Sequence, residues 1–132
     1  MGYIRFVRPN RIENQRHREG VFCAAYELRD CPSVDGRTLA HLEEILQWFR
    51  ENLPIAGRFN RSSSKGAYRR ETQGLSWYKD VATEAIGKSF ELVRLLAENG
   101  YPIEVLRCDR VGYVLYEDDH QVVAEPFGDT PT

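Results

Sequence analysis

The densest cluster of ionisable side chains in the sequence is Glu117-Asp118-Asp119-His120. Neighbouring carboxylates raise one another's pKa and an imidazole titrates at about pH 6.5, so these residue types suit acid–base chemistry or a divalent cation. Together with Arg110, the residues Glu117, Asp119 and His120 would form the site of a small metal- or His-dependent hydrolase or nuclease. The alternative is a turn at Asp118 and Asp119, with Glu117 and His120 paired across two strands. We expect the turn, because two residues of a tight turn cannot by themselves converge on a substrate.

A second group of functional residue types lies in the segment 55–74, which shows no hydrophobic period. Cations neutralise phosphates, hydroxyls position them, and aromatic rings stack on unpaired bases. The segment is not a Walker-type phosphate loop, because Ser64-Lys65-Gly66 has the wrong order for that motif. We expect a long basic loop that engages a macromolecular partner, either protein or nucleic acid, and a solvated loop is the alternative. The expected partner-binding residues are Arg58, Arg61, Lys65, Tyr68, Arg69 and Arg70.

The cysteines and histidines lack the spacing of a metal site or of a disulfide framework. Cys23, Cys31 and Cys108 are an odd number without a Cys-x-x-Cys pair, as expected of free thiols in a reducing cytosol. No Ser-His-Asp or Cys-His arrangement can be read from the spacing. We therefore expect no resident metal, no cofactor and no nucleophilic catalysis, and we expect a cytoplasmic location.

The composition is that of one soluble domain covering residues 1–132, with 42% hydrophobic and 29% charged residues. No apolar run approaches the roughly 20 residues that span a bilayer, so no membrane partner is expected. The pI of about 5.9 argues against a dedicated nucleic-acid-binding domain, whose pI is typically above about 9. No pattern indicates the oligomeric state.

Positive and negative charges are distributed unevenly along the chain. Residues 1–70 hold thirteen Lys and Arg against eight Asp and Glu, whereas residues 71–132 hold five against twelve. Several of the cations precede residue 20, where they could extend a basic face or pair with the acidic second half. We expect the pairing. These N-terminal cations are Arg5, Arg8, Arg11, Arg16 and Arg18.

Hydrophobic periodicity predicts one strand, three helices and three further strands. Residues 3–8 alternate with both faces partly apolar, as in a strand inside a sheet. Apolar residues recur three and four positions apart in 13–30, 39–53 and 77–99, which predicts helices. Three β-branched or aromatic runs separated by short polar breaks in 102–124 predict an antiparallel meander. In the longest helix, a stripe through Ile86, Phe90 and Val93 is expected to supply the core.

The expected fold class is α+β, with element order β-α-α-α-β-β-β and all helices packed on one face of the sheet. The four-stranded sheet would be antiparallel, or mixed if the first strand pairs in parallel with the meander. This order resembles that of the small bacterial ribonuclease toxins of the RelE and ParE type, without a shared motif from which residue roles could be inferred. The sequence therefore favours a cytosolic binding or regulatory module over an enzyme.

Overall fold

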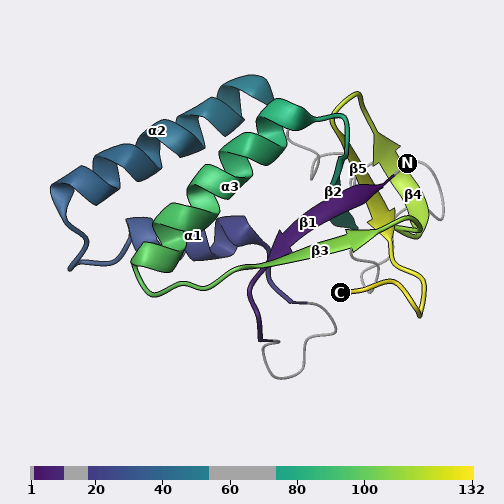
Figure 1. Ribbon diagram of the computed structural model, residues 1–132, viewed down its shortest axis with the longest axis horizontal. Helices are drawn as coiled ribbons and strands as arrows, with labels where there is room; N and C mark the ends of the chain where they lie inside the picture. Colours follow the sequence, from purple (N-terminus) through teal and green to yellow (C-terminus); the bar gives the residue numbers. More distant parts are fainter. Residues whose placement is uncertain (1, 11–17, 54–73) are drawn as a thin grey trace, which may run out of the picture.

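The computed structural model describes residues 2–10, 18–53 and 74–132. Within these ranges the chain forms three helices and five strands, in the order β-α-α-β-α-β-β-β (Figure 1). The fold class is α+β, as predicted, with one strand more than predicted and a different element order. The elements are β1 (Tyr3–Val7), α1 (Val21–Arg29), α2 (Gly36–Asn52), β2 (Leu75–Lys79), α3 (Thr83–Glu98), β3 (Glu104–Cys108), β4 (Tyr113–Glu117) and β5 (Gln121–Glu125).

The additional strand is β2, in a segment where the sequence predicted the start of a long helix. Apolar residues at Val81, Ala82 and Ala85 continue the helical period and extend it backwards to Trp77. The residues of β2 themselves alternate between the two faces of the sheet and include Trp77 and Tyr78, which favour strands. Lys79 ends the strand, and α3 begins at Thr83 after a short turn. The periodicity of a helix therefore concealed a strand directly before it.

The sheet is antiparallel throughout, in the order β3-β1-β2-β5-β4. Strand β1 lies inside the sheet, as the apolar residues on both of its faces predicted. Strands β4 and β5 form the predicted hairpin. Strands β3 and β4 do not pair, however, because they lie at opposite edges of the sheet. The break 109–112 is therefore a crossing and not a hairpin turn.

This crossing requires the sheet to curl. In a flat sheet, four strand spacings would separate β3 from β4 by about 19 Å. The two ends to be joined, Cys108 and Tyr113, would also lie about 17 Å apart along the strands, because they are five residue positions apart in the register of the sheet. The four residues of 109–112 reach at most about 18 Å. The opposite corners must consequently approach each other over one face of the sheet, and Val111 in the crossing is only 4% exposed.

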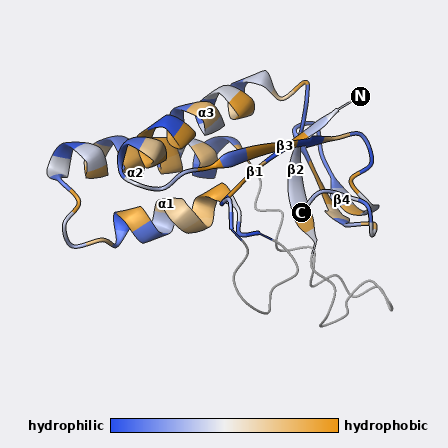
Figure 2. Cartoon of the chain, turned by 60° about the horizontal axis from the view of Figure 1, so that its bottom comes forward, coloured by the Kyte–Doolittle hydropathy of each residue, from blue (hydrophilic) through white to orange (hydrophobic). Residues whose placement is uncertain are grey.

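The three helices pack on the other face of the sheet, against its β1–β2 part, and their apolar sides point toward it (Figure 2). Ile4 and Phe6 of β1 and Tyr78 of β2 pack there against buried residues of all three helices. In α3 the buried stripe is centred on Leu92, whereas Phe90 is 42% exposed. The predicted stripe through Phe90 was therefore placed too far around the helix. Its other members, Ile86 and Val93, pack at the margin of the core.

The ends of the helices follow from local chemistry. Asp35 caps α2 by accepting a 2.8 Å hydrogen bond from the Thr38 amide. Leu53 has an extended backbone because Pro54 follows it, and α2 ends there. Gly20 precedes α1 as an N-cap without a side chain that could satisfy the first amides.

The face opposite the helices holds a second, smaller core. Trp77 is fully buried there with Leu75, Val122, Ala124 and Val111 of the crossing. Gly112 makes the close approach possible: its φ is +123°, and a Cβ at this position would lie 1.9 Å from the Glu125 carbonyl oxygen. The C-terminal tail secures the crossing, because Thr130 donates a 3.1 Å hydrogen bond to the Arg110 carbonyl.

Candidate functional site

The predicted acidic cluster lies at the tip of the β4–β5 hairpin, where Asp118 builds the turn. Its Oδ1 accepts hydrogen bonds from the amides of His120 and Gln121, at 2.8 and 2.9 Å. Its Oδ2 accepts from the Tyr116 hydroxyl at 2.8 Å. Burial alone would raise the pKa of Asp118, but the hydrogen bonds outweigh it, so that the pKa lies below its ordinary value. This carboxylate is engaged as an anionic turn residue, which is unsuited to proton transfer near neutral pH.

The other residues of the alternative catalytic set do not meet around a common point. Glu117 forms a 2.6 Å ion pair with Lys79 of β2, and it therefore does not make the expected pair with His120. Asp119 is exposed at the tip, and His120 borders a cavity beside the start of α3. Arg110 lies beyond the opposite end of β4, with its guanidinium 4.8 Å from the centre of the Phe127 ring. Among the described residues, no group of three His, Cys, Asp or Glu could hold a metal ion.

All six predicted binding residues, and the whole predicted basic loop except Gly74, lie outside the described residues. Leu53, where α2 ends, and Gly74, which precedes β2, flank the part of the loop that is not described. The six expected contacts are Arg58, Arg61, Lys65, Tyr68, Arg69 and Arg70.

Two of the N-terminal arginines form ion pairs, one of them as expected with the acidic second half of the chain. Arg8 contacts Glu27 at 2.6 Å and Glu19 at 3.6 Å, and Arg18 contacts Glu104 at 2.8 Å. Only the Arg18 pair joins the first half of the chain to its acidic second half. These two arginines are neutralised locally and add little to a basic face.

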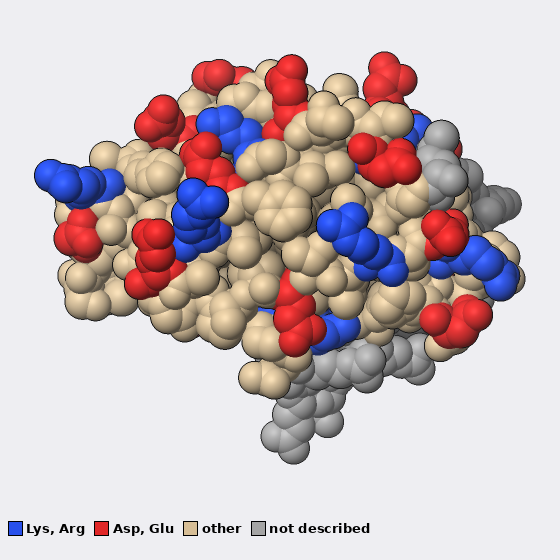
Figure 3. Space-filling model, viewed as in Figure 1, with Lys and Arg blue, Asp and Glu red and all other residues tan. Residues whose placement is uncertain are grey.

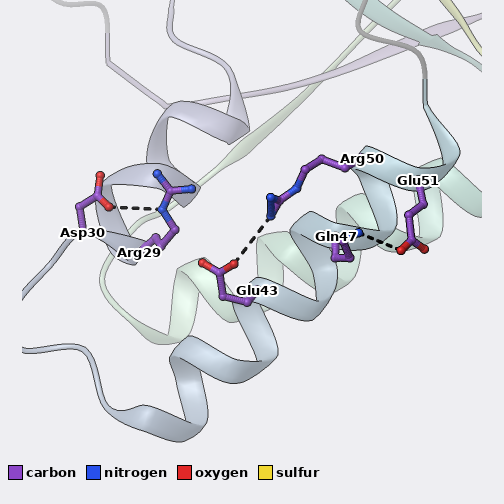
Figure 4. A network of polar contacts seen from close by, with 6 residues as sticks. All are labelled: Arg29, Asp30, Glu43, Gln47, Arg50 and Glu51. Carbon is purple, nitrogen blue, oxygen red and sulfur yellow. Dashed lines mark hydrogen bonds and ion pairs between the residues drawn. The ribbon is translucent and has the colours of Figure 1, made fainter.

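The described surface carries its charges in mixed pairs. On the face shown in Figure 3, basic and acidic side chains alternate without a patch of one sign. Figure 4 shows the outer side of α1 and α2, where Arg50 lies 3.7 Å from Glu43 and Arg29 lies 3.3 Å from Asp30. Exposed pairs of this kind contribute about 0 to 1 kcal/mol each to stability. They leave no concentration of positive charge on the helical layer.

Arg5 is the exception among the N-terminal arginines, because it is buried and has no carboxylate partner among the described residues. It is 8% exposed, on the face of the sheet opposite the helices. Its Nη2 donates to the Arg18 carbonyl at 3.0 Å, whereas Nη1 has no hydrogen-bond partner in the described part of the chain. Burial, with a smaller contribution from the Arg18 cation, lowers the pKa of Arg5 to about 10. The guanidinium is thus a desolvated cation with a free donor.

Arg5 borders a cavity of about 170 Å³ that opens where β1 and β2 part. The two strands pair only at Tyr3–Lys79 and Ile4–Tyr78. Beyond this point the cavity is lined by residues at the start of α1, namely Gly20, Val21 and Phe22. Ser76 and Tyr78 of β2 also line it, and Gly74 lies at its rim. Sequence reasoning missed this site because Arg5 looks like any solvent-facing cation of an alternating strand. Nothing in the spacing indicates that its side chain is buried.

No family model, no curated protein and no solved structure matches this chain. The likeness to the ribonuclease toxins therefore remains one of predicted element order, and β2 between α2 and α3 departs from that order. In the described ranges, no helix is long and apolar enough to cross a membrane.

Proposed function

We propose that the protein is a binding module that engages an anionic macromolecular partner through the basic loop 55–74. The observation that carries this proposal is a contrast of charge. Residues 54–73 hold five Lys and Arg and one carboxylate, a net charge of +4, while the remainder holds thirteen cations and nineteen carboxylates, a net charge of −6. A polyanion would be attracted to this segment and repelled by the remainder of the chain.

The described residues support this reading, because many of their cations already have acidic partners. Ion pairs engage six of them, and the contacts are 2.6 to 3.7 Å long. A paired cation has less to offer a polyanion than an unpaired one. The paired cations are Arg8, Arg18, Arg29, Arg50, Lys79 and Lys88.

The alternative, a hydrolase or nuclease at the hairpin, has no comparable support. Asp118 is engaged in the turn and Glu117 in an ion pair with Lys79. Arg110 lies at the other end of β4, so it cannot join His120 around one substrate.

The test is a binding measurement with two matched quadruple variants. The loop variant changes Arg61, Lys65, Arg69 and Arg70 to Ala, and the control changes Arg29, Arg37, Arg50 and Arg94, which lie on the helices. Binding of a fluorescent single-stranded RNA is followed by anisotropy over a salt series. Each lost phosphate contact lowers the slope of log K against log salt by about 0.7, so the loop variant should lose up to about 3.

The control variant should bind almost as the wild type does, since it changes the net charge equally but elsewhere. An equal loss in both variants, or no loss in the loop variant, would contradict the proposal. A labelled acidic peptide replaces the RNA in a second arm. If the partner is a nucleic acid, Tyr68→Ala should weaken RNA binding through lost stacking and leave peptide binding unchanged.

A further inference from the structure

A buried cation needs a counter-charge or an acceptor, and Arg5 lacks one within the described residues. Its Nη1 has no hydrogen-bond partner there, and no described carboxylate lies within ion-pair distance. An uncompensated buried charge is costly, so binding of a counter-group would stabilise the folded protein. Arginine has no acceptor atom, and the missing partner must therefore be an acceptor.

The cavity next to Arg5 also receives the N-terminus of α1. A helix N-terminus carries a partial positive charge and amides without intrahelical acceptors. Neither Gly20 nor the first turn of α1 supplies an acidic side chain to offset them. Val21 and Phe22, in that first turn, line the same cavity as Arg5. A buried guanidinium and a helix N-terminus thus lie at one opening, and both favour an anion.

A second buried donor lies on the strand next to Arg5. Ile4 and Tyr78 pair on the helix side, so Arg5 and Trp77, the next residues along, both point to the opposite face. The strands no longer pair at these two residues, and Trp77 is not among the described residues that line the cavity. Trp77 is fully buried, and its indole Nε1 has no acceptor among the described residues. The indole N–H can only donate. Two buried side chains on this face thus each present a donor that has no acceptor among the described residues.

The carboxylate of Glu19 does not satisfy this demand. Glu19 precedes Gly20, but its carboxylate already lies 3.6 Å from Arg8. It also interacts with the Cys23 thiol, and burial together with this interaction raises the pKa of Cys23. The cavity has a volume of about 170 Å³, whereas one water needs about 10 to 15 Å³ by the same measure. A small anionic group with accompanying waters would fit.

We propose that the opening between β1 and β2 is a binding site for a single anionic group, a carboxylate or a phosphate, held by Arg5 and the N-terminus of α1. The site is separate from the basic loop and does not depend on the function proposed for that loop. The two anion chemistries share the demand for acceptor oxygens. They differ in charge and size, and the titrations below distinguish them.

The experiment titrates the full chain with sodium phosphate and, separately, with sodium acetate, against sodium chloride at matched ionic strength. Nitrogen-15 spectra follow the Trp77 indole, which Trp77→Phe assigns, and the Arg5 guanidinium. Thermal unfolding curves at each anion concentration give the midpoint temperature of unfolding. We expect the Arg5 resonance to shift with saturation, accompanied by the Trp77 indole, and the midpoint to rise with the logarithm of anion concentration. The stronger of the two responses identifies the anion class.

Arg5→Met should abolish the rise in the midpoint, and Arg94→Met on α3 should retain it, since Arg94 is exposed. An unchanged rise in Arg5→Met would overturn the proposal, because the anion would then act elsewhere. The proposal would also be overturned if neither phosphate nor acetate shifted the Arg5 resonance of the wild type. This measurement does not depend on the folding of any variant. A third overturning result is that Glu13→Gln or Glu71→Gln shifts the Arg5 resonance in anion-free buffer, because a carboxylate of the chain itself would then be the partner.

Discussion

The two faces of the sheet are buried by different means. The helix side is covered by α1, α2 and α3, which pack aliphatic and aromatic side chains onto Ile4, Phe6 and Tyr78. The opposite side is covered by the curl of the sheet itself, by the crossing 109–112 and by the C-terminal tail. Buried polar atoms without partners among the described residues occur on both sides: Ser89 Oγ on the helix side, and Arg5 Nη1 and Trp77 Nε1 on the opposite one. Only Arg5 carries a charge. We infer that the helix side supplies most of the stability. The opposite side is less stabilising because it buries the charge of Arg5, which is available to bind an anion.

The largest expected effect concerns the helix face. Leu92 is fully buried at the centre of the α3 stripe, so Leu92→Ala should lower the free energy of unfolding by about 2 to 5 kcal/mol. Phe90 is 42% exposed and contacts the Phe6 ring at 5.1 Å between centroids, so Phe90→Ala should cost about 1 to 2 kcal/mol. Urea unfolding measures both. A larger loss for Phe90→Ala would place the core on the other side of the helix.

The next effect concerns the closure of the opposite face. Gly112→Ala would force a Cβ against the Glu125 carbonyl at a backbone φ of +123°, and we expect a loss of at least about 2 kcal/mol in unfolding free energy. Gly128→Ala is the control, since a Cβ there meets no atom within 4 Å, and its effect should stay within about 1 kcal/mol. Equal effects of the two substitutions would mean that the crossing does not pass close to β5.

A smaller effect concerns the tip of the β4–β5 hairpin. Asp118→Asn should lower the unfolding free energy by about 1 to 2 kcal/mol at pH 7, because the carboxylate accepts several hydrogen bonds. The folded pKa of Asp118 is below its unfolded value near 3.8. Its stabilisation is therefore present above about pH 4 and is lost as the pH falls through the folded pKa.

The check is urea unfolding at pH 7 and at several lower pH values. The difference between wild type and Asp118→Asn should shrink in the acid range. Asp119→Asn should change stability by no more than about 0.5 kcal/mol at any of these pH values, since Asp119 is exposed. A difference for Asp118→Asn that stays constant with pH would show that its charge is not involved.

The sequence predicts the helix face better than the opposite one, and the reason is physical. The spacing of apolar residues predicts the helices. Their beginnings or ends are marked by Asp35, Gly20 and Pro54. The curl depends on which strands lie at the edges, and no local pattern encodes that order. The short break 109–112 has the composition of a turn whether it joins neighbouring strands or crosses the sheet.

The candidate sites follow the same division. The turn at Asp118 could be predicted, because Asp accepts hydrogen bonds from the amides that follow it. The isolation of Arg110 from His120 could not be predicted, since it depends on the direction of β4. The burial of Arg5 could not be predicted either, since it depends on how distant parts of the chain, among them Arg18, pack around its side chain.

The most direct test of the contrast between the faces is the stability of Arg5→Met in chloride buffer without phosphate or carboxylate. If the Arg5 site is empty in this buffer, the buried charge of Arg5 has no counter-charge. Removing that charge should then leave the unfolding free energy within about 1 kcal/mol of the wild-type value or raise it. A loss of about 3 kcal/mol or more in urea unfolding would mean that Arg5 belongs to a completed internal pair, and it would contradict this account.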